Sequence, residues 1–173
     1  MRAILGAVAV LVVAGAASQA SAQVTGTVDI TGSVEDRCEF TIDSGLIALG
    51  ELSGTGGLLN TAAVDGESDD LNGWCNGTAA EMTVEANALQ NIDYVAAPPA
   101  GFDRVVNFTA TATASTGSAN DSSAALGAGT PSTVGIFSSN ISVVLSASAT
   151  PGGGKLIAGD YVGSVDVTLT PSP

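Results

Sequence analysis

The chain has 173 residues, a length that suits one domain of ordinary size. Its 17 Asp and Glu residues outnumber 4 Lys and Arg residues, and a net charge of −13 excludes the clustered cations that binding to nucleic acid or an anionic membrane requires. The absence of histidine excludes Ser-His-Asp and Cys-His catalysis, whereas 45% hydrophobic residues favour a folded domain over a disordered acidic chain.

The N-terminus has the pattern of an export signal. Arg2 gives a positive start, the stretch 3–17 is almost wholly apolar, and the tripeptide ASA at 20–22 supplies the small residues that precede a cleavage site. We therefore expect a signal peptide over 1–22 and a mature chain over 23–173. A membrane anchor is the less favoured alternative, because about 15 apolar residues fall short of the ~20 that span a bilayer.

The first segment of the mature chain alternates strictly between apolar or glycine residues and polar residues. This period of two predicts an extended strand over Val24 to Val34. The strand can be the first one of the chain's own sandwich, or it can pair with a neighbouring subunit by strand addition. One of its faces presents Val24, Gly26, Val28, Ile30, Gly32 and Val34.

Five further stretches show the same alternation and predict strands. Between them lie runs rich in Gly, Ser, Asn and Asp, such as VDGESDD at 64–70 and STGSANDSS at 115–123, which are typical of turns. No convincing helical stripe follows the signal peptide. The pattern predicts an all-β fold, an antiparallel β-sandwich with one solvated face on each sheet. The apolar rows run along 38–42, 82–88, 106–114, 141–149 and 161–169.

Cys38 and Cys75 are the only cysteines. In an exported chain an even number of cysteines predicts disulfide pairing, so we expect these two to form one disulfide. A redox or metal pair is not favoured, because the chain has neither a Cys-x-x-Cys motif nor a histidine.

Acidic residues are the remaining candidates for chemistry. The run Asp65 to Asp70 could hold calcium through clustered oxygens, but Asp70 stands where an EF-hand loop requires glycine. We favour an exposed acidic loop there and leave calcium binding open. The carboxylate pairs, Asp69 with Asp70 and Glu35 with Asp36, lie in polar runs typical of solvated turns, so a carboxylate-only secreted hydrolase is the least favoured function. We predict no catalytic residue, no cofactor and no metal.

Four short stretches, taken in their order and spacing, are similar to one known family. They are VTGTVDITGSVEDRC at 24–38, LGEL at 49–52, LNGWCNGT at 71–78 and AGDYVGSVDVTLT at 158–170. Together they resemble the archaic chaperone–usher pilins, which have a spore coat protein U-like domain. The resemblance implies an immunoglobulin-like sandwich that lacks its last strand and is completed by a donor strand. The chain would then divide into a signal peptide (1–22), a donor-strand segment (23–37) and a pilin-like sandwich (38–173).

The resemblance also implies partners and a location. In that family a periplasmic chaperone lends a strand to the subunit, an outer-membrane usher receives it, and the N-terminal segment of the next subunit replaces the chaperone strand. The chain would therefore pass through the periplasm to the cell surface. There it would form a pilus or fimbria with copies of itself or related pilins, supporting adhesion or biofilm formation. No nucleic-acid partner is expected.

Particular residues acquire roles by the same resemblance. Cys38 and Cys75 match the family's disulfide. At its C-terminus the chain departs from the family, and we expect the last strand to stop near Thr170, because the prolines that follow cannot donate ladder hydrogen bonds. The donor side chains that enter the neighbour's groove would be Val24, Val28, Ile30 and Val34, with Gly26 and Gly32 where the approach is tight. The strand bordering the groove would present Tyr161, Val165, Val167 and Leu169.

A second function remains open from the residues alone. The strand over 24–34 can pair within its own chain, which would make the protein a self-complete secreted β-sandwich. Such a sandwich would serve as a coat or ligand-binding protein. The two hypotheses differ in what the first strand pairs with, and in whether the rest of the sandwich is complete without it.

Overall fold

The structure is a computed structural model that describes residues 24–172. The predicted signal peptide over 1–22 lies outside these residues. The chain divides into two units, of which the first ends at Ser33 and the second begins at Val34. The second unit contains every strand of the described chain, and it starts four residues before the predicted sandwich boundary at Cys38.

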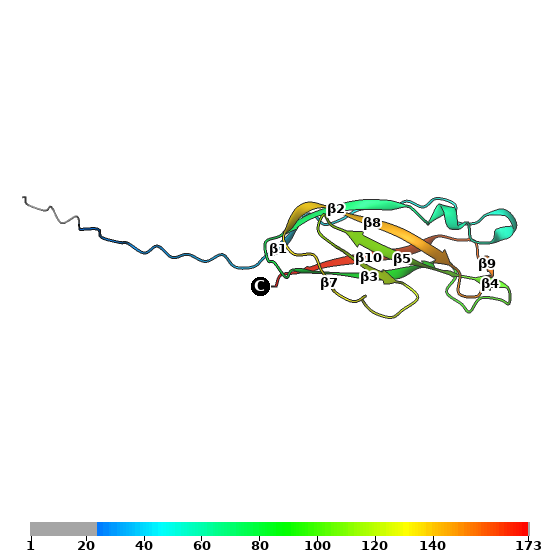
Figure 1. Cartoon of the computed structure of the whole chain (residues 1–173). Helices are drawn as coiled ribbons and strands as arrows, with labels where there is room; N and C mark the ends of the chain where they lie inside the picture. The colour runs from blue at the N-terminus through cyan, green and yellow to red at the C-terminus, as the bar shows by residue number, and fades with distance from the viewer. Residues whose placement is uncertain (1–23, 173) are drawn as a thin grey trace, which may run out of the picture. The chain divides into compact units, whose positions relative to one another are not determined.

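Ten strands and two 3₁₀ helices are found among the described residues (Figure 1). The helices η1 (Thr55–Gly57) and η2 (Thr61–Ala63) have three residues each. The strands are β1 (Cys38–Ile42), β2 (Ser68–Cys75), β3 (Glu81–Asn91), β4 (Phe102–Asp103), β5 (Val105–Thr113), β6 (Ser118–Ser122), β7 (Ser132–Thr133), β8 (Phe137–Ala149), β9 (Lys155–Leu156) and β10 (Tyr161–Thr170). The strand β10 ends at Thr170, as predicted.

The strands form a curled sheet that folds into two layers connected by β5. The start of β5 pairs with β3, and its residues 109–113 pair with β6 and β8. One layer has the order β1-β2-β8-β5-β6, and the other contains β7, β3 and β10. All these pairs are antiparallel, so the predicted all-β antiparallel sandwich is confirmed. Among the described residues only the short pair of β4 and β9 is parallel.

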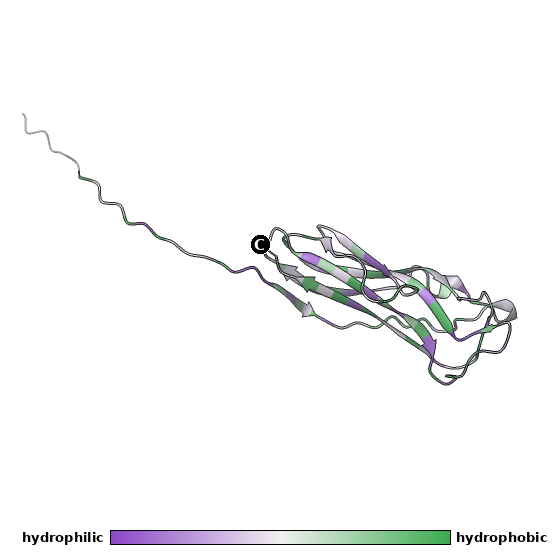
Figure 2. Ribbon diagram, turned by 90° about the horizontal axis from the view of Figure 1, so that it is seen from below, coloured by the Kyte–Doolittle hydropathy of each residue, from purple (hydrophilic) through white to green (hydrophobic). Residues whose placement is uncertain are grey.

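Alternate side chains of the strands fill the space between the layers. In β3, Met82 and Val84 have no solvent exposure, whereas Glu81, Thr83 and Glu85, which alternate with them, are partly exposed. Across the β5–β8 pair, Ala110 lies opposite Leu145, so a small side chain meets a large one. Figure 2 shows apolar and polar positions alternating along the strands. The period of two seen in the sequence therefore sets which side chains form the core.

Two segments that we predicted as turns are strands. Residues 68–70 begin β2 and pair with β8, and residues 118–122 form β6 and pair with β5. Both segments are rich in Ser, Asn and Asp, residues that local preference assigns to turns. Their pairing partners lie more than 70 residues away for β2 and on the neighbouring strand for β6. Tertiary pairing overrides the weak local preference at these two places.

Candidate functional site: an open groove beside β10

Strand β10 is paired on one edge only. Among residues 24–172 it pairs with β3, and its other edge pairs with no strand. Its inward side chains are half-buried, whereas the inward side chains of β3 beside it are fully buried. An edge of this kind leaves main-chain N–H and C=O groups free for another strand. The four predicted groove residues, which all pack against the core, are Tyr161, Val165, Val167 and Leu169.

The opposite wall of the gap is the chain that follows β1. β1 pairs with the last four residues of β2 and ends at Ile42 after an irregularity in register. The segment 45–49 then continues without forming a strand. The carboxylate of Asp69 accepts a hydrogen bond of 2.5 Å from the main-chain N–H of Leu46. A side chain at Gly45 would overlap Asp69, so glycine leaves room for this contact.

A groove lies between these two walls. Its first compartment has a volume of ≈ 260 Å³ and lies between 45–49 on one side and 163–165 on the other. The floor consists of buried core side chains, among them Leu89, Phe108 and Leu145. The core is therefore reachable from solvent between the two walls.

A second compartment continues the groove to the end of the sandwich where β10 begins. It has a volume of ≈ 830 Å³ and shares Ile47, Leu89 and Gly163 with the first compartment. Of the four predicted groove residues, Val165 lines the first compartment and Tyr161 lines the second, whereas Val167 and Leu169 line neither. The groove thus borders the first half of β10.

The second half of β10 faces a closed part of the gap. A Cβ added to Gly73 in β2 would lie 3.3 Å from a methyl carbon of Leu169 and 3.4 Å from a ring carbon of Phe40. Side chains from β10 and β1 therefore both lie over the bare backbone of Gly73. This end of the sandwich, with the start of β1, the end of β2 and the end of β10, is called the base below, and the opposite end is called the tip.

The predicted disulfide between Cys38 and Cys75 is present and fixes the base. It joins the first residue of β1 to the last residue of β2, and these two residues are also partners in the strand register. No cysteine of the described chain is free. A disulfide indicates an oxidising, extracytoplasmic environment.

The predicted donor segment is extended in sequence pattern but forms no strand in this chain. Residues 24–37 have no regular secondary structure. The side chains of Val24, Val28 and Ile30 are 91%, 85% and 92% exposed, and Val34 is 86% exposed. Four branched apolar side chains on one face of a tail are thus available to a partner. Gly26 and Gly32 lie between them and have no atom near the position of a Cβ.

Two acidic side chains of the run at 65–70 accept hydrogen bonds from main-chain N–H groups. Asp65 accepts a hydrogen bond of 2.9 Å from the main-chain N–H of Ser148, and Asp69 binds Leu46 as described above. Because β2 begins at Ser68, the predicted exposed loop is wrong for residues 68–70. Within 24–172, no group of three or more acidic or cysteine side chains is placed to hold a metal ion.

One carboxylate in the groove has a perturbed pKa. The hydroxyl and the main-chain N–H of Ser53 donate hydrogen bonds of 2.7 Å and 2.9 Å to Glu51, and they hold the pKa of this carboxyl below its ordinary value. Glu51 is therefore an anion at neutral pH in the second compartment.

The groove offers an apolar floor and a free backbone edge on β10, an arrangement suited to binding a strand.

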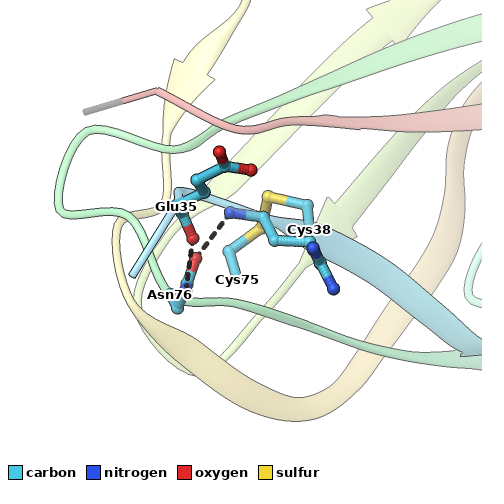
Figure 3. Close-up of a disulfide and its surroundings, with 5 residues drawn as sticks. Glu35, Cys38, Cys75 and Asn76 are labelled. Carbon is cyan, nitrogen blue, oxygen red and sulfur yellow. Dashed lines mark hydrogen bonds between the residues drawn. A yellow bond between two sulfur atoms is a disulfide. The ribbon is translucent and has the colours of Figure 1, made fainter. Parts of the chain in front are cut away.

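Two features of the site escaped the sequence analysis. The wall at 45–49 contains Ile47 and Leu49, which pack against the core without belonging to a strand. Asn76 was noted for no role, yet its side chain binds the backbone of residues 35 and 37 (Figure 3). The LGEL stretch at 49–52 was the only signal for the wall, and it came from resemblance.

Comparison of the chain with protein-family models, with curated proteins and with solved structures finds no match. Among residues 24–172, no helix is long and apolar enough to cross a membrane. The function is therefore argued from the groove and the tail. They define a class, an all-β sandwich with one strand edge open over its core.

Proposed function

We propose that this chain is a non-enzymatic structural subunit of a bacterial surface pilus or fimbria, assembled by donor-strand exchange. The N-terminal tail of one copy fills the groove of the next, and the filament supports adhesion or biofilm formation. The single observation that carries the proposal is the unpaired edge of β10 over an open groove. The same chain has an N-terminal tail with the alternation of a strand and with exposed apolar side chains.

The dimensions of the two parts support this pairing. β10 has 10 residues, and the tail segment 24–34 has eleven. At about 3.3 Å per residue both extend over roughly 33–36 Å. A tail of this length can pair with the whole free edge of β10.

The energetics favour the same arrangement. Burying four branched aliphatic side chains stabilises the joined state by about 6–12 kcal/mol before ordering costs, at ~1.5–3 kcal/mol for each. Ladder hydrogen bonds add ~0.5–1.5 kcal/mol each. An open edge over an apolar groove is an aggregation hazard in the free subunit. A periplasmic chaperone that lends a strand would cover that edge until an outer-membrane usher receives the subunit.

The contact between tail and groove joins two different surfaces of the same molecule. A heterologous contact that does not close on itself generates a filament. One chain can therefore supply every subunit of the polymer, and a related pilin with a similar tail can join it.

The experiment uses the mature chain, residues 23–173, and a matched variant in which Val28→Asp and Ile30→Asp place charges on the apolar face of the tail. We expect the unaltered chain to form polymers in a concentration-dependent way, seen by electron microscopy, and the variant to remain monomeric. A synthetic peptide with the sequence of residues 24–34 should bind the monomeric variant. The same peptide with both Asp substitutions serves as the control and should not bind.

The alternative, a self-complete coat or ligand-binding sandwich, gives the opposite results. It expects the unaltered chain to stay monomeric at all concentrations, and it expects no binding of the peptide. Monomers in both samples together with no peptide binding would refute the proposed function.

A further inference from the structure

The short linker between the tail and the sandwich is fixed to the base. Oδ1 of Asn76 accepts a hydrogen bond of 2.6 Å from the N–H of Arg37, and its Nδ2 donates one of 3.0 Å to the carbonyl of Glu35 (Figure 3). The main-chain N–H of Asn76 donates a third, of 3.1 Å, to the carbonyl of Arg37. Cys75, which precedes Asn76, and Cys38, which follows Arg37, form the disulfide. One side chain thus sets the direction in which the chain enters the sandwich.

The residue after Asn76 adds to this arrangement. A Cβ at Gly77 would overlap the carbonyl oxygen of Ser172 and would lie 3.1 Å from a carboxylate oxygen of Asp36. The turn after β2 therefore lies against both the linker and the C-terminal end of the described chain. We call this group the base collar, and it consists of Glu35, Asp36, Arg37, Asn76, Gly77 and Ser172.

The opposite end of the sandwich exposes apolar side chains around the short parallel pair of β4 and β9. Phe102 and Lys155 are register partners there, and both are exposed. Asp103, which is buried, accepts hydrogen bonds of 3.3 Å and 2.6 Å from the N–H groups of Gly152 and Gly154, and so holds the turn before β9 in place. We call this surface the tip plate, and it consists of Ile92 (56% exposed), Val95 (77%), Phe102 (43%) and Lys155.

The shape of the groove decides which end of one copy meets which end of the next. The groove is open along the first half of β10, toward the tip, and closed toward the base, where Phe40 and Leu169 both lie over Gly73. A tail that adds antiparallel to β10, as nearly all pairs in this fold do, has Val34 beside Tyr161 at the tip. Only the free N-terminal end of the tail then has to enter the closed half.

The length of the linker limits the distance between the two copies. Four residue steps separate Val34 from Cys38, which span at most about 14 Å at ~3.5 Å per residue. Because Asn76 already holds this stretch against its own sandwich, the base of the incoming copy must lie close to the tip of the receiving one.

The charges of the two surfaces suit this contact. The mature chain has only three cations, and one of them, Lys155, stands in the tip plate. The base collar contains the adjacent carboxylates of Glu35 and Asp36 and the guanidinium of Arg37, so its net charge is −1, opposite in sign to that of Lys155. Opposite charges at a partly exposed contact favour one register over others.

We propose that consecutive copies of this chain make a second contact in addition to the inserted tail, in which the base collar of one copy docks on the tip plate of the next. Asn76 is the positioning residue that makes this joint stiff. The contact rests on the proposed function, since it forms only between copies that have exchanged strands. Its occupant is a second copy of the chain.

The experiment introduces one cysteine at each proposed surface, in the mature chain with Glu35→Cys and Lys155→Cys. Polymers are first confirmed by electron microscopy and then treated with a short bis-maleimide. We expect a ladder of covalently linked multimers. The matched control pairs Glu35→Cys with Asn120→Cys, whose second site is an exposed residue in the middle of the sandwich on β6. This control should give several-fold less linked product.

A second pair of variants tests the stiffness of the joint. Asn76→Ala removes the side-chain contacts with the linker. Asn72→Ala, four residues earlier in β2, removes the bonds of its side chain with Thr41 and Asn140 without touching the linker. We expect filaments of the Asn76 variant to have a persistence length several-fold shorter than those of the Asn72 variant, at equal affinity for the 24–34 peptide.

The outcomes separate the two proposals. Polymers that form but give equal cross-linking in both cysteine pairs, or equal persistence lengths in both alanine variants, would overturn the joint and leave donor-strand exchange standing. Unaltered chains that form no polymer at all would overturn both.

Discussion

Strands β3 and β10 lie side by side and have the same alternation of side chains, yet they are in different situations. The second edge of β3 is covered along its length by four separate partners. β7 pairs with its start, Gly129 donates to the carbonyl of Val84, the carboxylate of Asp121 accepts from Ala86, and β5 pairs with its end. The second edge of β10 has no partner among the described residues.

This difference between β3 and β10 indicates which strand edge needs a partner from outside the chain. On β3, main-chain N–H and C=O groups of the second edge are hydrogen-bonded by varied partners, including a buried carboxylate. Buried main-chain polar groups need such partners, and unpaired strand edges are normally covered. The bare edge of β10 over a groove is therefore the place to look for an external strand. Four changes test this comparison, beginning with the largest expected effect.

The first prediction concerns the disulfide, which joins the start of β1 to the end of β2. Replacing Cys38 and Cys75 by serine should lower the free energy of unfolding by about 4 kcal/mol, because a closed loop of this length restricts the unfolded chain. Urea unfolding of the mature chain measures it. Either single serine variant should lose as much as the double variant, and a loss confined to one of them would contradict the entropic explanation.

The second prediction compares register partners on the two strands. Val84 on β3 is fully buried and lies opposite the half-buried Val167 on β10. Val84→Ala should destabilise the free subunit by about 2–3 kcal/mol, and Val167→Ala by about 1 kcal/mol.

Binding of the 24–34 peptide should bring the two values together, because it buries Val167. Thermal unfolding with and without the peptide measures both effects. Equal costs in the free subunit would mean that β10 is already covered.

The third prediction removes one of the partners of β3. Asp121→Ala leaves the buried N–H of Ala86 without its acceptor, which costs about 1–3 kcal/mol. The control Asp166→Ala removes an exposed carboxylate on β10 and should change stability little. If both variants lost the same stability, the hydrogen bond to Ala86 would not be needed to cover β3.

The fourth prediction opens the closed half of the groove. Gly73→Ala places a methyl group beside Phe40 and Leu169, at 3.0 Å from the carbonyl of Glu39. The residues of β1 and β10 that lie over Gly73 must therefore move away slightly. We expect a loss of about 1 kcal/mol from overpacking, together with faster binding of the 24–34 peptide. Stopped-flow fluorescence of a labelled peptide gives the rate. Slower binding would show that the closed half does not oppose the entry of the tail.

Much of the fold could be predicted from alternation alone. The row at 106–114 gave the inward residues of β5 correctly, because side chains on a strand alternate whatever its neighbours are. The row at 82–88 was right as far as Ala86, after which the alternation shifts and Leu89 is buried in place of Ala88. The row at 141–149 was right as far as Leu145, after which Ser148 is buried and Ala147 and Ala149 are exposed. The turn-like composition of 64–70 and 115–123 hid the start of β2 and all of β6. Those strands exist because distant partners supply their hydrogen bonds, and composition does not report a partner.

Only part of the candidate site could be predicted from the sequence. Tyr161 and Val165 were assigned to the groove by resemblance, and they line it. The opposite wall at 45–49 follows no period of two, so no pattern could place it. Asn76 was one polar residue among many, and its role became visible only when β2 brought it beside the linker.

From the sequence alone we could obtain the all-β class, the inward residues of β5 and of the first parts of β3 and β8, and the cysteine pair. Each of these depends on local alternation or on a count of residues. The tertiary structure alone decided which strand edge stays open, where the groove closes and what holds the linker. These features depend on which distant segments become neighbours, and that choice is made by packing of the whole domain rather than by any one segment.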